Sequence, residues 1–147
     1  MKTGLRFYDR NVIVNNTTTV VIEKACIDIN DIEGLSNAFR MIPAINHYIK
    51  SHPLYREDDF GQPNIVITGK GISKCDPDDS YNRRTGFNIA DTRAQRDIFK
   101  KAYNFYSEIA GLIEKYFYGD ILSKIGKTGN SVHECIRHEY NIGYSFN

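Results

Sequence analysis

The sequence predicts an α+β fold in which a small antiparallel β-sheet is packed by one long helix from the C-terminal half of the chain and by shorter helices. Two segments rich in β-branched residues, residues 5–28 and 65–75, supply the expected strands. From Arg83 onward apolar residues recur every third or fourth position, for about eight turns of ~3.6 residues each. With 147 residues the chain has the length of one ordinary domain, so we expect residues 1–147 to form a single unit.

The N-terminal segment has the pattern of a β-hairpin. Residues 5–8 and 12–14 lead into Asn15, Asn16 and Thr17, and asparagine tolerates the positive φ that a tight turn needs. Residues 18–27 are again rich in β-branched side chains. Together with the strand at residues 65–75, the hairpin gives at least three antiparallel strands, enough for a small sheet with one apolar face.

The strand at residues 65–75 runs directly into a tight acidic turn and the long helix. Gly69 and Gly71 let another backbone or a ligand approach closely, and we expect a bulge at one of them. Pro77 and its acidic neighbours end the strand at Cys75. Asn82 is the expected N-cap of the helix. The apolar face of that helix comprises Phe87, Ala90, Ala94, Ile98, Ala102, Phe105, Ile109 and Leu112.

The segments before and after this unit are less regular. Apolar spacing from Ile32 to Ile49 predicts a helix capped by Asn30 or Asp31, and Pro43 should kink or split it. Residues 51–63 contain two prolines and an acidic run, so we expect a solvated loop there. Toward the C-terminus a short apolar turn at residues 121–125 precedes a segment, residues 132–140, that fits a short helix.

The charge balance excludes a protein with a broad basic surface for nucleic acid or anionic membranes. Nineteen basic residues oppose eighteen acidic ones, for a net charge of +1, so any basic surface must be local. Three widely spaced cysteines, Cys26, Cys75 and Cys135, fit free thiols in a reducing compartment better than disulfides. No segment resembles a signal peptide or the ~18 apolar residues of a membrane helix, so we expect a cytoplasmic protein without membrane contact.

A local basic site is predicted where the strand ends and the long helix begins. Lys74 lies near the end of the strand, and Arg83, Arg84 and Arg93 lie in the first turns of the helix. The unpaired N–H groups and the dipole at a helix N-terminus favour anionic groups such as phosphate, which arginine can bind through two parallel hydrogen bonds. The alternative is that Arg83 and Arg84 pair with the acidic residues of the turn, residues 76–79, and neutralise them.

Aromatic residues lie near these cations in the sequence. Tyr81, Phe87 and Phe99 can stack on a purine if a ring face is exposed, and Asn88 can supply a polar contact. Aromatics at helical spacing more often belong to a core, and for Phe87 that is the favoured interpretation. The candidate ligand-binding residues are therefore Lys74, Arg83, Arg84, Phe87, Asn88, Arg93 and Phe99.

Catalytic and metal-binding patterns are weak. His133, Cys135 and His138 have metal-ligand side chains, but no second cluster completes a tetrahedral zinc site. No nucleophile lies in a G-x-S-x-G turn, and the acidic turn lacks a partner that would define acid and base roles. We therefore expect no metal, no cofactor and no catalysis.

Residues 71–94 carry a pattern that resembles a known family. The pattern is G-x-x-K-C-x-P-x-D-x-Y-x-x-x-x-G-x-x-I-A-x-x-R-A, filled here by Gly71, Lys74, Cys75, Pro77, Asp79, Tyr81, Gly86, Ile89, Ala90, Arg93 and Ala94. It is similar to a signature of small phage proteins, and most resembles the Thoeris anti-defence sponges, which sequester cyclic ADP-ribose signals made by host immune enzymes. The resemblance implies a non-catalytic binding protein of the host cytoplasm that holds a cyclic ADP-ribose isomer.

A second function fits the same residues. The basic helix start would also suit a phage accessory protein that binds nucleic acid or a host protein, although a net charge of +1 weighs against nucleic acid. An enzyme that degrades the signal is a third reading, for which the sequence offers no residues.

We also expect a homo-oligomer, a dimer or a multiple of dimers, built on the long helix. A second apolar line runs along that helix, whereas a surface helix normally needs one stripe. The helix after Asp31 can cover part of this line within the chain, and a second copy would then cover the rest. The line comprises Phe99, Tyr103, Tyr106, Ala110, Ile113 and Phe117.

Overall fold

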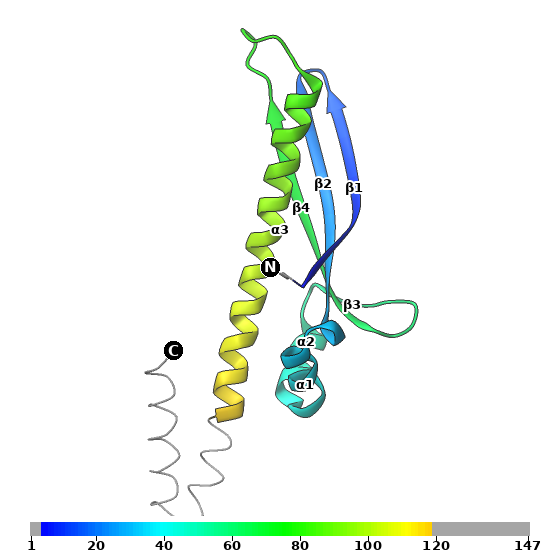
Figure 1. Cartoon of the computed structure of the whole chain (residues 1–147), viewed down its shortest axis with the longest axis vertical. Helices are drawn as coiled ribbons and strands as arrows, with labels where there is room; N and C mark the ends of the chain where they lie inside the picture. Colours follow the sequence, from blue (N-terminus) through cyan, green and yellow to red (C-terminus); the bar gives the residue numbers. More distant parts are fainter. Residues whose placement is uncertain (1–3, 119–147) are drawn as a thin grey trace, which may run out of the picture.

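A computed structural model describes residues 4–118 of the chain and places a four-stranded antiparallel sheet against one long helix (Figure 1). This arrangement confirms the α+β prediction. Residues 1–3 and 119–147 lie outside the described part, so a single domain over residues 1–147 stays a prediction. The strands are β1 (Leu5–Asn15), β2 (Thr18–Asp28), β3 (Tyr55–Glu57) and β4 (Pro63–Lys74), in the spatial order β1-β2-β4-β3. The helices are α1 (Glu33–Met41), α2 (Pro43–Ser51) and α3 (Arg83–Ile113), with a 3₁₀ turn at Ile29–Asp31 and a π-helical turn at Glu114–Tyr118.

The predicted hairpin is present as β1 and β2. Asn15 pairs with Thr18, and Asn16 between them has a φ of 55°, the left-handed conformation that asparagine tolerates. The register of the hairpin shifts between Phe7 and Asp9, where β1 carries a bulge. The bulge expected at Gly69 or Gly71 is absent, because β4 pairs with β2 without interruption over all of β2.

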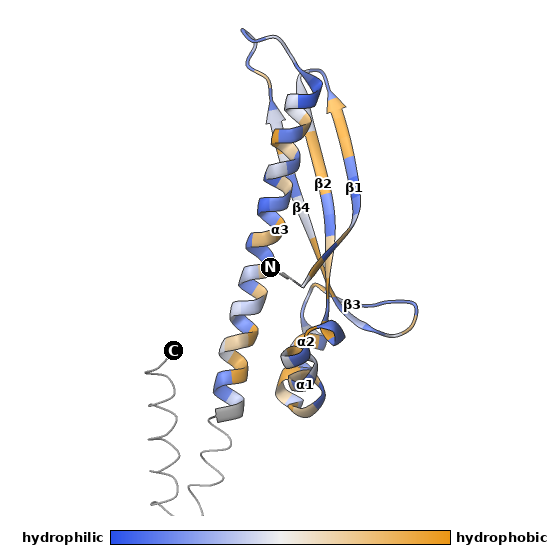
Figure 2. Ribbon diagram, in the orientation of Figure 1, coloured by the Kyte–Doolittle hydropathy of each residue, from blue (hydrophilic) through white to orange (hydrophobic). Residues whose placement is uncertain are grey.

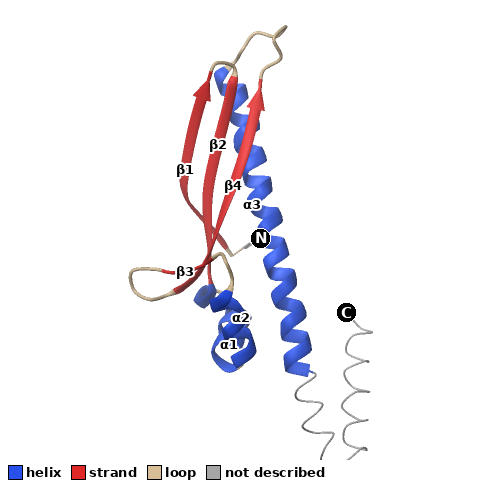
Figure 3. Ribbon diagram, turned by 180° about the vertical axis from the view of Figure 1, so that it is seen from behind, coloured by secondary structure: helices blue, strands red, loops and turns tan. Residues whose placement is uncertain are grey.

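One face of the sheet is covered by α3 and the other carries no described helix (Figure 3). Alternate residues of β2 and β4, among them Val21, Ala25, Ile27, Ile65 and Ile67, are buried on the α3 side. The predicted apolar face of α3 is buried against them at Ala90, Ala94, Ile98, Ala102, Phe105 and Ile109. Leu112 is partly buried at the end of the same face.

Two glycines of β4 allow the helix to lie directly on the strand. A Cβ atom added to Gly71 would stand 1.8 Å from the carbonyl oxygen of Ala90, and one added to Gly69 would stand 2.4 Å from that of Ala94. The close approach expected at these glycines is therefore made by the backbone of α3 rather than by a ligand.

The outer edge of β4 is covered by polar side chains of α3. Arg93 donates from Nη1 to the carbonyl oxygen of Ile72 at 2.5 Å. One turn on, Asp97 Oδ2 accepts from the N–H of Lys70 at 3.2 Å. After another turn, Lys101 Nζ donates to the carbonyl oxygen of Thr68 at 2.7 Å and pairs with Asp97 at 2.9 Å. These three residues satisfy backbone groups that β3 is too short to reach.

The segment between β2 and β4 packs beside the second half of α3. Pro43 splits the predicted helix into α1 and α2, whose apolar residues are orange in Figure 2. Asn30 and Asp31 do not cap α1, which begins after Ile32, whereas Asp28 caps the preceding 3₁₀ turn. The expected loop at residues 51–63 contains the short strand β3, so that prediction was wrong for Tyr55–Glu57. None of the described helices combines the length and apolar composition needed to cross a membrane.

Much of the second apolar line of α3 is used within the chain. Tyr106 and Ile113 pack against the main core, and Phe99 meets Phe7 edge to face at 6.0 Å. Tyr103, in contrast, is 71% exposed. The side chain of Phe117 lies outside the described part, and the oligomer expected on this line stays a prediction.

Gly71→Ala should lower the free energy of unfolding by about 3 kcal/mol, because the new methyl group must displace the helix backbone. The control is Gly111→Ala, a glycine within α3 whose added Cβ would have no atom within 4 Å. That change should raise the free energy of unfolding by roughly 0.5–1 kcal/mol, because alanine favours the helix. Urea unfolding measures both, and equal effects of the two substitutions would contradict the close contact at Gly71.

Candidate functional site

The end of β4 and the start of α3 enclose a hollow of about 420 Å³. It lies where the sequence predicts a basic site. Polar residues and the aromatic residue Tyr81 line it. The lining residues are Ser73, Lys74, Cys75, Asp76, Asp79, Ser80, Tyr81, Asn82, Thr85, Gly86 and Ile89.

The acidic turn is held by hydrogen bonds among its own side-chain and backbone groups. Asp76 Oδ1 accepts from the N–H of Asp78 at 3.0 Å, and the N–H of Asp79 donates to the carbonyl oxygen of Asp76 at 3.0 Å. The N–H of Cys75 donates to the carbonyl oxygen of Thr17 at 3.0 Å, which ties the turn to the β1–β2 hairpin. The acidic residues therefore build the loop, as expected for side chains that form Asx turns.

The start of α3 is capped and tied to β2. Asn82 Oδ1 accepts from the N–H of Thr85 at 3.1 Å, which confirms the predicted N-cap. The hydroxyl groups of Tyr81 and Thr19 lie 3.2 Å apart within hydrogen-bonding distance. An added Cβ on Gly86 would stand 3.1 Å from Thr19 Oγ1, so a small residue is needed where the helix crosses β2. These contacts hold one wall of the hollow in place.

The four predicted cations occupy different surroundings. Lys74 lines the hollow and is exposed. Arg83 and Arg84 are exposed in the first turn of α3, next to the lining residues Asn82 and Thr85. Within residues 4–118 neither arginine forms an ion pair, so the alternative pairing with the acidic turn is not formed. The guanidinium group of Arg93 is hydrogen-bonded to the carbonyl oxygen of Ile72, on the edge of β4.

The other predicted residues do not face the hollow. Phe87 is partly buried against Val21, Ala90 and Ala94, as expected for a core residue. Asn88 is exposed, and its carbonyl oxygen accepts from Thr92 Oγ1 at 2.8 Å. Phe99 lies three helical turns further on, against Phe7. Of the seven candidates, Lys74 alone lines the hollow, with Arg83 and Arg84 beside it.

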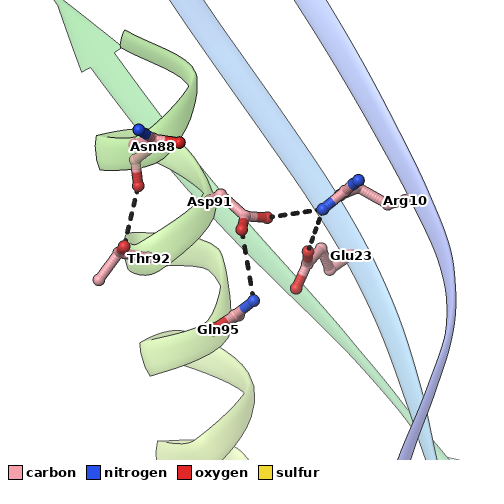
Figure 4. A network of polar contacts seen from close by, with 6 residues as sticks. All are labelled: Arg10, Glu23, Asn88, Asp91, Thr92 and Gln95. Carbon is pink, nitrogen blue, oxygen red and sulfur yellow. Dashed lines mark hydrogen bonds and ion pairs between the residues drawn. The ribbon is translucent and has the colours of Figure 1, made fainter. Parts of the chain in front are cut away.

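The structure also brings together a buried acidic cluster that the sequence analysis did not identify (Figure 4). Glu23 of β2 is only 4% exposed and faces Asp91 of α3. Arg10 of β1 approaches both carboxylates, at 3.9 Å from Glu23 and 3.7 Å from Asp91. Its guanidinium group also lies 5.1 Å from the ring centre of Phe87. Gln95 Nε2 donates to Asp91 Oδ2 at 3.3 Å.

The carboxylate oxygens of this cluster outnumber the hydrogen-bond donors that reach them. Glu23 Oε2 and Asp91 Oδ1 are buried without a hydrogen-bond partner. Burial raises the pKa of Glu23 to about 7, helped by the neighbouring Asp91 carboxylate and opposed by Arg10. Between pH 4.5 and about 7 the folded protein therefore holds a proton that the unfolded chain would release.

Strand alternation could have revealed the buried glutamate. Glu23 falls between Val21 and Ala25 at a spacing of two residues, so all three must share one face of β2. That face is the buried one. Asp91 could not have been assigned as its partner, because the lateral position of α3 on the sheet is not encoded in the spacing of either element.

The described residues contain no group of three or more His, Cys, Asp or Glu that could hold a metal ion. His133, Cys135 and His138 lie outside the described part, so the expectation of no metal site there stays a prediction. Comparison with protein-family models, with curated proteins and with solved structures found no match.

The raised pKa of Glu23 predicts a stability that falls as pH rises from 5 to 8. A proton held in the folded state stabilises it below the unfolded pKa of 4.5, and this stabilisation is lost as pH passes through about 7. The full loss should be roughly 3 kcal/mol. Glu23→Gln should remove this slope and be more stable than the wild type at pH 8.

Urea unfolding at several pH values measures this slope. Glu33→Gln, an exposed glutamate of α1, is the matched control and should keep the wild-type slope. Parallel pH profiles for the wild type and Glu23→Gln would show that the buried carboxyl does not titrate in this range.

Proposed function

We propose that the protein is a non-catalytic binding protein that sequesters a small phosphate-bearing nucleotide at the junction of β4 and α3. The resemblance of residues 71–94 to Thoeris anti-defence sponges makes a cyclic ADP-ribose isomer the proposed ligand, and a phage protein acting in the host cytoplasm the proposed context. The observation that carries the proposal is the hollow at the start of the long helix, which Lys74 lines.

The size and chemistry of the hollow support a small anionic ligand. Its volume of about 420 Å³ lies within the range of pockets that hold small molecules, roughly 300–1,000 Å³. Lys74 supplies a positive charge, and Ser80 and Thr85 supply hydroxyl groups. The N-terminus of a helix adds a partial positive charge of about half an elementary charge, which favours phosphate.

Polar acceptors and an aromatic ring complete the lining. The carboxylates of Asp76 and Asp79 can accept hydrogen bonds from ribose hydroxyl groups. Tyr81 offers the edge or face of its ring, while its hydroxyl group is engaged with Thr19. Such a mixture of positive, acceptor and aromatic groups suits a nucleotide better than a simple anion.

The exposed arginines also favour the second candidate function. Arg83 and Arg84 are free of ion pairs within the described chain and project from the surface. They could bind an acidic patch on a host protein, or a nucleic acid backbone, as an accessory phage protein would require. A net charge of +1 weighs against the nucleic acid.

A capture-and-release experiment tests the proposal. The purified full-length protein is incubated with a cyclic ADP-ribose isomer, and the free ligand is measured by chromatography before and after the protein is heat-denatured. A sponge should remove the ligand and release it intact. New products would identify an enzyme, and an unchanged ligand concentration would favour the accessory protein.

Lys74→Ala and Arg84→Ala should each weaken ligand binding by about tenfold to a hundredfold. A charge-assisted hydrogen bond contributes roughly 1.5–3 kcal/mol, and neither side chain makes a described contact on which the fold depends. Calorimetric titration gives the affinities. Lys100→Ala, an exposed lysine further along α3, is the control and should bind as the wild type does. Wild-type affinity in both the Lys74→Ala and the Arg84→Ala variant would show that the ligand does not bind in this hollow.

A further inference from the structure

The two edges of the sheet differ in their protection. At the β4 edge, β3 pairs with three residues, and the side chains of Arg93, Asp97 and Lys101 bond three more backbone groups. At the opposite edge, β1 is an 11-residue strand with no described element beyond it (Figures 1 and 3). Within the described chain, no hydrogen bond reaches the outer backbone groups of residues 11–14. An uncovered edge of this kind is a template for another strand.

The protective features of β1 are confined to its first half. The bulge between Phe7 and Asp9 interrupts the edge, and Arg6, Asp9 and Arg10 add charge. Beyond Arg10 the strand reads Asn-Val-Ile-Val-Asn, without charge, glycine or proline. The upper half of β1 is accordingly orange in Figure 2. Its three apolar side chains are exposed, with Ile13 at 48%.

Ile13 is also the end of an apolar row that crosses the uncovered face of the sheet. Ile13 is paired with Val20, and Val20 is paired with Ile72, so the three side chains lie side by side on the face away from α3. Ile72 is 37% exposed at the far end of the row. The row stops at the β1 edge because the described chain has no further strand there.

We propose that residues 11–15 of β1 pair with the same residues of a second copy of this chain, antiparallel and centred on Ile13, so that two sheets join into one. A two-fold axis perpendicular to a sheet places one residue opposite itself, which sets Ile13 against the Ile13 of the other copy. Val12 then lies opposite Val14 on the α3 side. The row Ile13–Val20–Ile72 continues into the matching row of the second copy.

The strand's own pattern favours a second copy over a foreign peptide. Each apolar residue of this half-strand meets an apolar residue, each Asn meets an Asn, and no like charges oppose each other. The proposal goes beyond the proposed function and does not depend on ligand binding. It places the interface on β1, separate from the apolar line of α3.

The test is the mass of the full-length protein over a wide concentration series, because a small interface of this kind gives a weak dimer. Sedimentation velocity should show a concentration-dependent dimer for the wild type. Ile13→Lys sets two lysines opposite each other and should raise the dimer dissociation constant at least about tenfold. Ile72→Lys is the matched control, on the same row and similarly exposed but two strands from the axis, and should leave the constant unchanged.

A crosslink tests the register. Directly opposed residues of antiparallel strands have Cβ atoms about 4.5–5.5 Å apart, so Ile13→Cys should form a disulfide-linked dimer under mild oxidation, beyond any formed by the wild-type cysteines. Ile72→Cys should form none. Circular dichroism checks that each variant is folded.

Three results would overturn the proposal. One is a wild type that stays monomeric at every concentration; slow hydrogen exchange of the outward-facing N–H groups of Val12 and Val14 in that monomer would assign the edge to another segment of the same chain. A second is a dimer that both lysine variants keep or both lose. A third is the absence of the Ile13→Cys crosslink. Capture of ligand by a monomeric Ile13→Lys variant would leave the proposed function intact, so the two proposals fail separately.

Discussion

The close contact between the backbones of β4 and α3 at Gly69 and Gly71 sets the geometry of the rest of the structure. Helices normally lie on a sheet at a distance set by side chains, and here two side chains are missing. The resulting approach lets Arg93, Asp97 and Lys101 reach over the side of β4 and bond its edge.

The same contact determines what is buried beneath the helix. Because α3 lies so close to β4, its other flank comes down over β2 and covers Glu23. A carboxyl group in this position has lost most of its water and gained few donors, which is why its pKa is raised. The helix start is drawn toward β2 as well, through Tyr81 and Thr19, and this forms the wall of the hollow.

Local sequence rules predicted the elements well. The asparagines of the hairpin turn, the cap at Asn82 and the break at Pro43 each act through their own backbone, so they can be read one residue at a time. The apolar face of α3 was predicted for a similar reason, since helical spacing depends on the helix alone. The strand β3 was missed because Tyr55–Glu57 is too short to show alternation.

The site was less predictable, because side-chain roles depend on how elements meet. Arg93 was expected near a ligand from its place in the first turns of the helix, yet the side of the helix on which it lies takes it to the edge of β4. The bulge was assigned to the glycines of β4 rather than to β1. For Arg93 and for the glycines of β4, the contact between strand and helix, which no spacing reports, decided the outcome.

The order of the strands has a consequence for how the chain folds. The hairpin β1–β2 and the unit β4–α3 are each built from neighbouring segments, so their contacts close short loops. Pairing of β2 with β4, as between Val21 and Gly71, joins segments separated by α1, α2 and β3. Closing that long intervening segment costs the most chain entropy, so the union of two preformed halves is expected to limit the folding rate. Until it occurs, Glu23 remains in water and keeps its ordinary acidity.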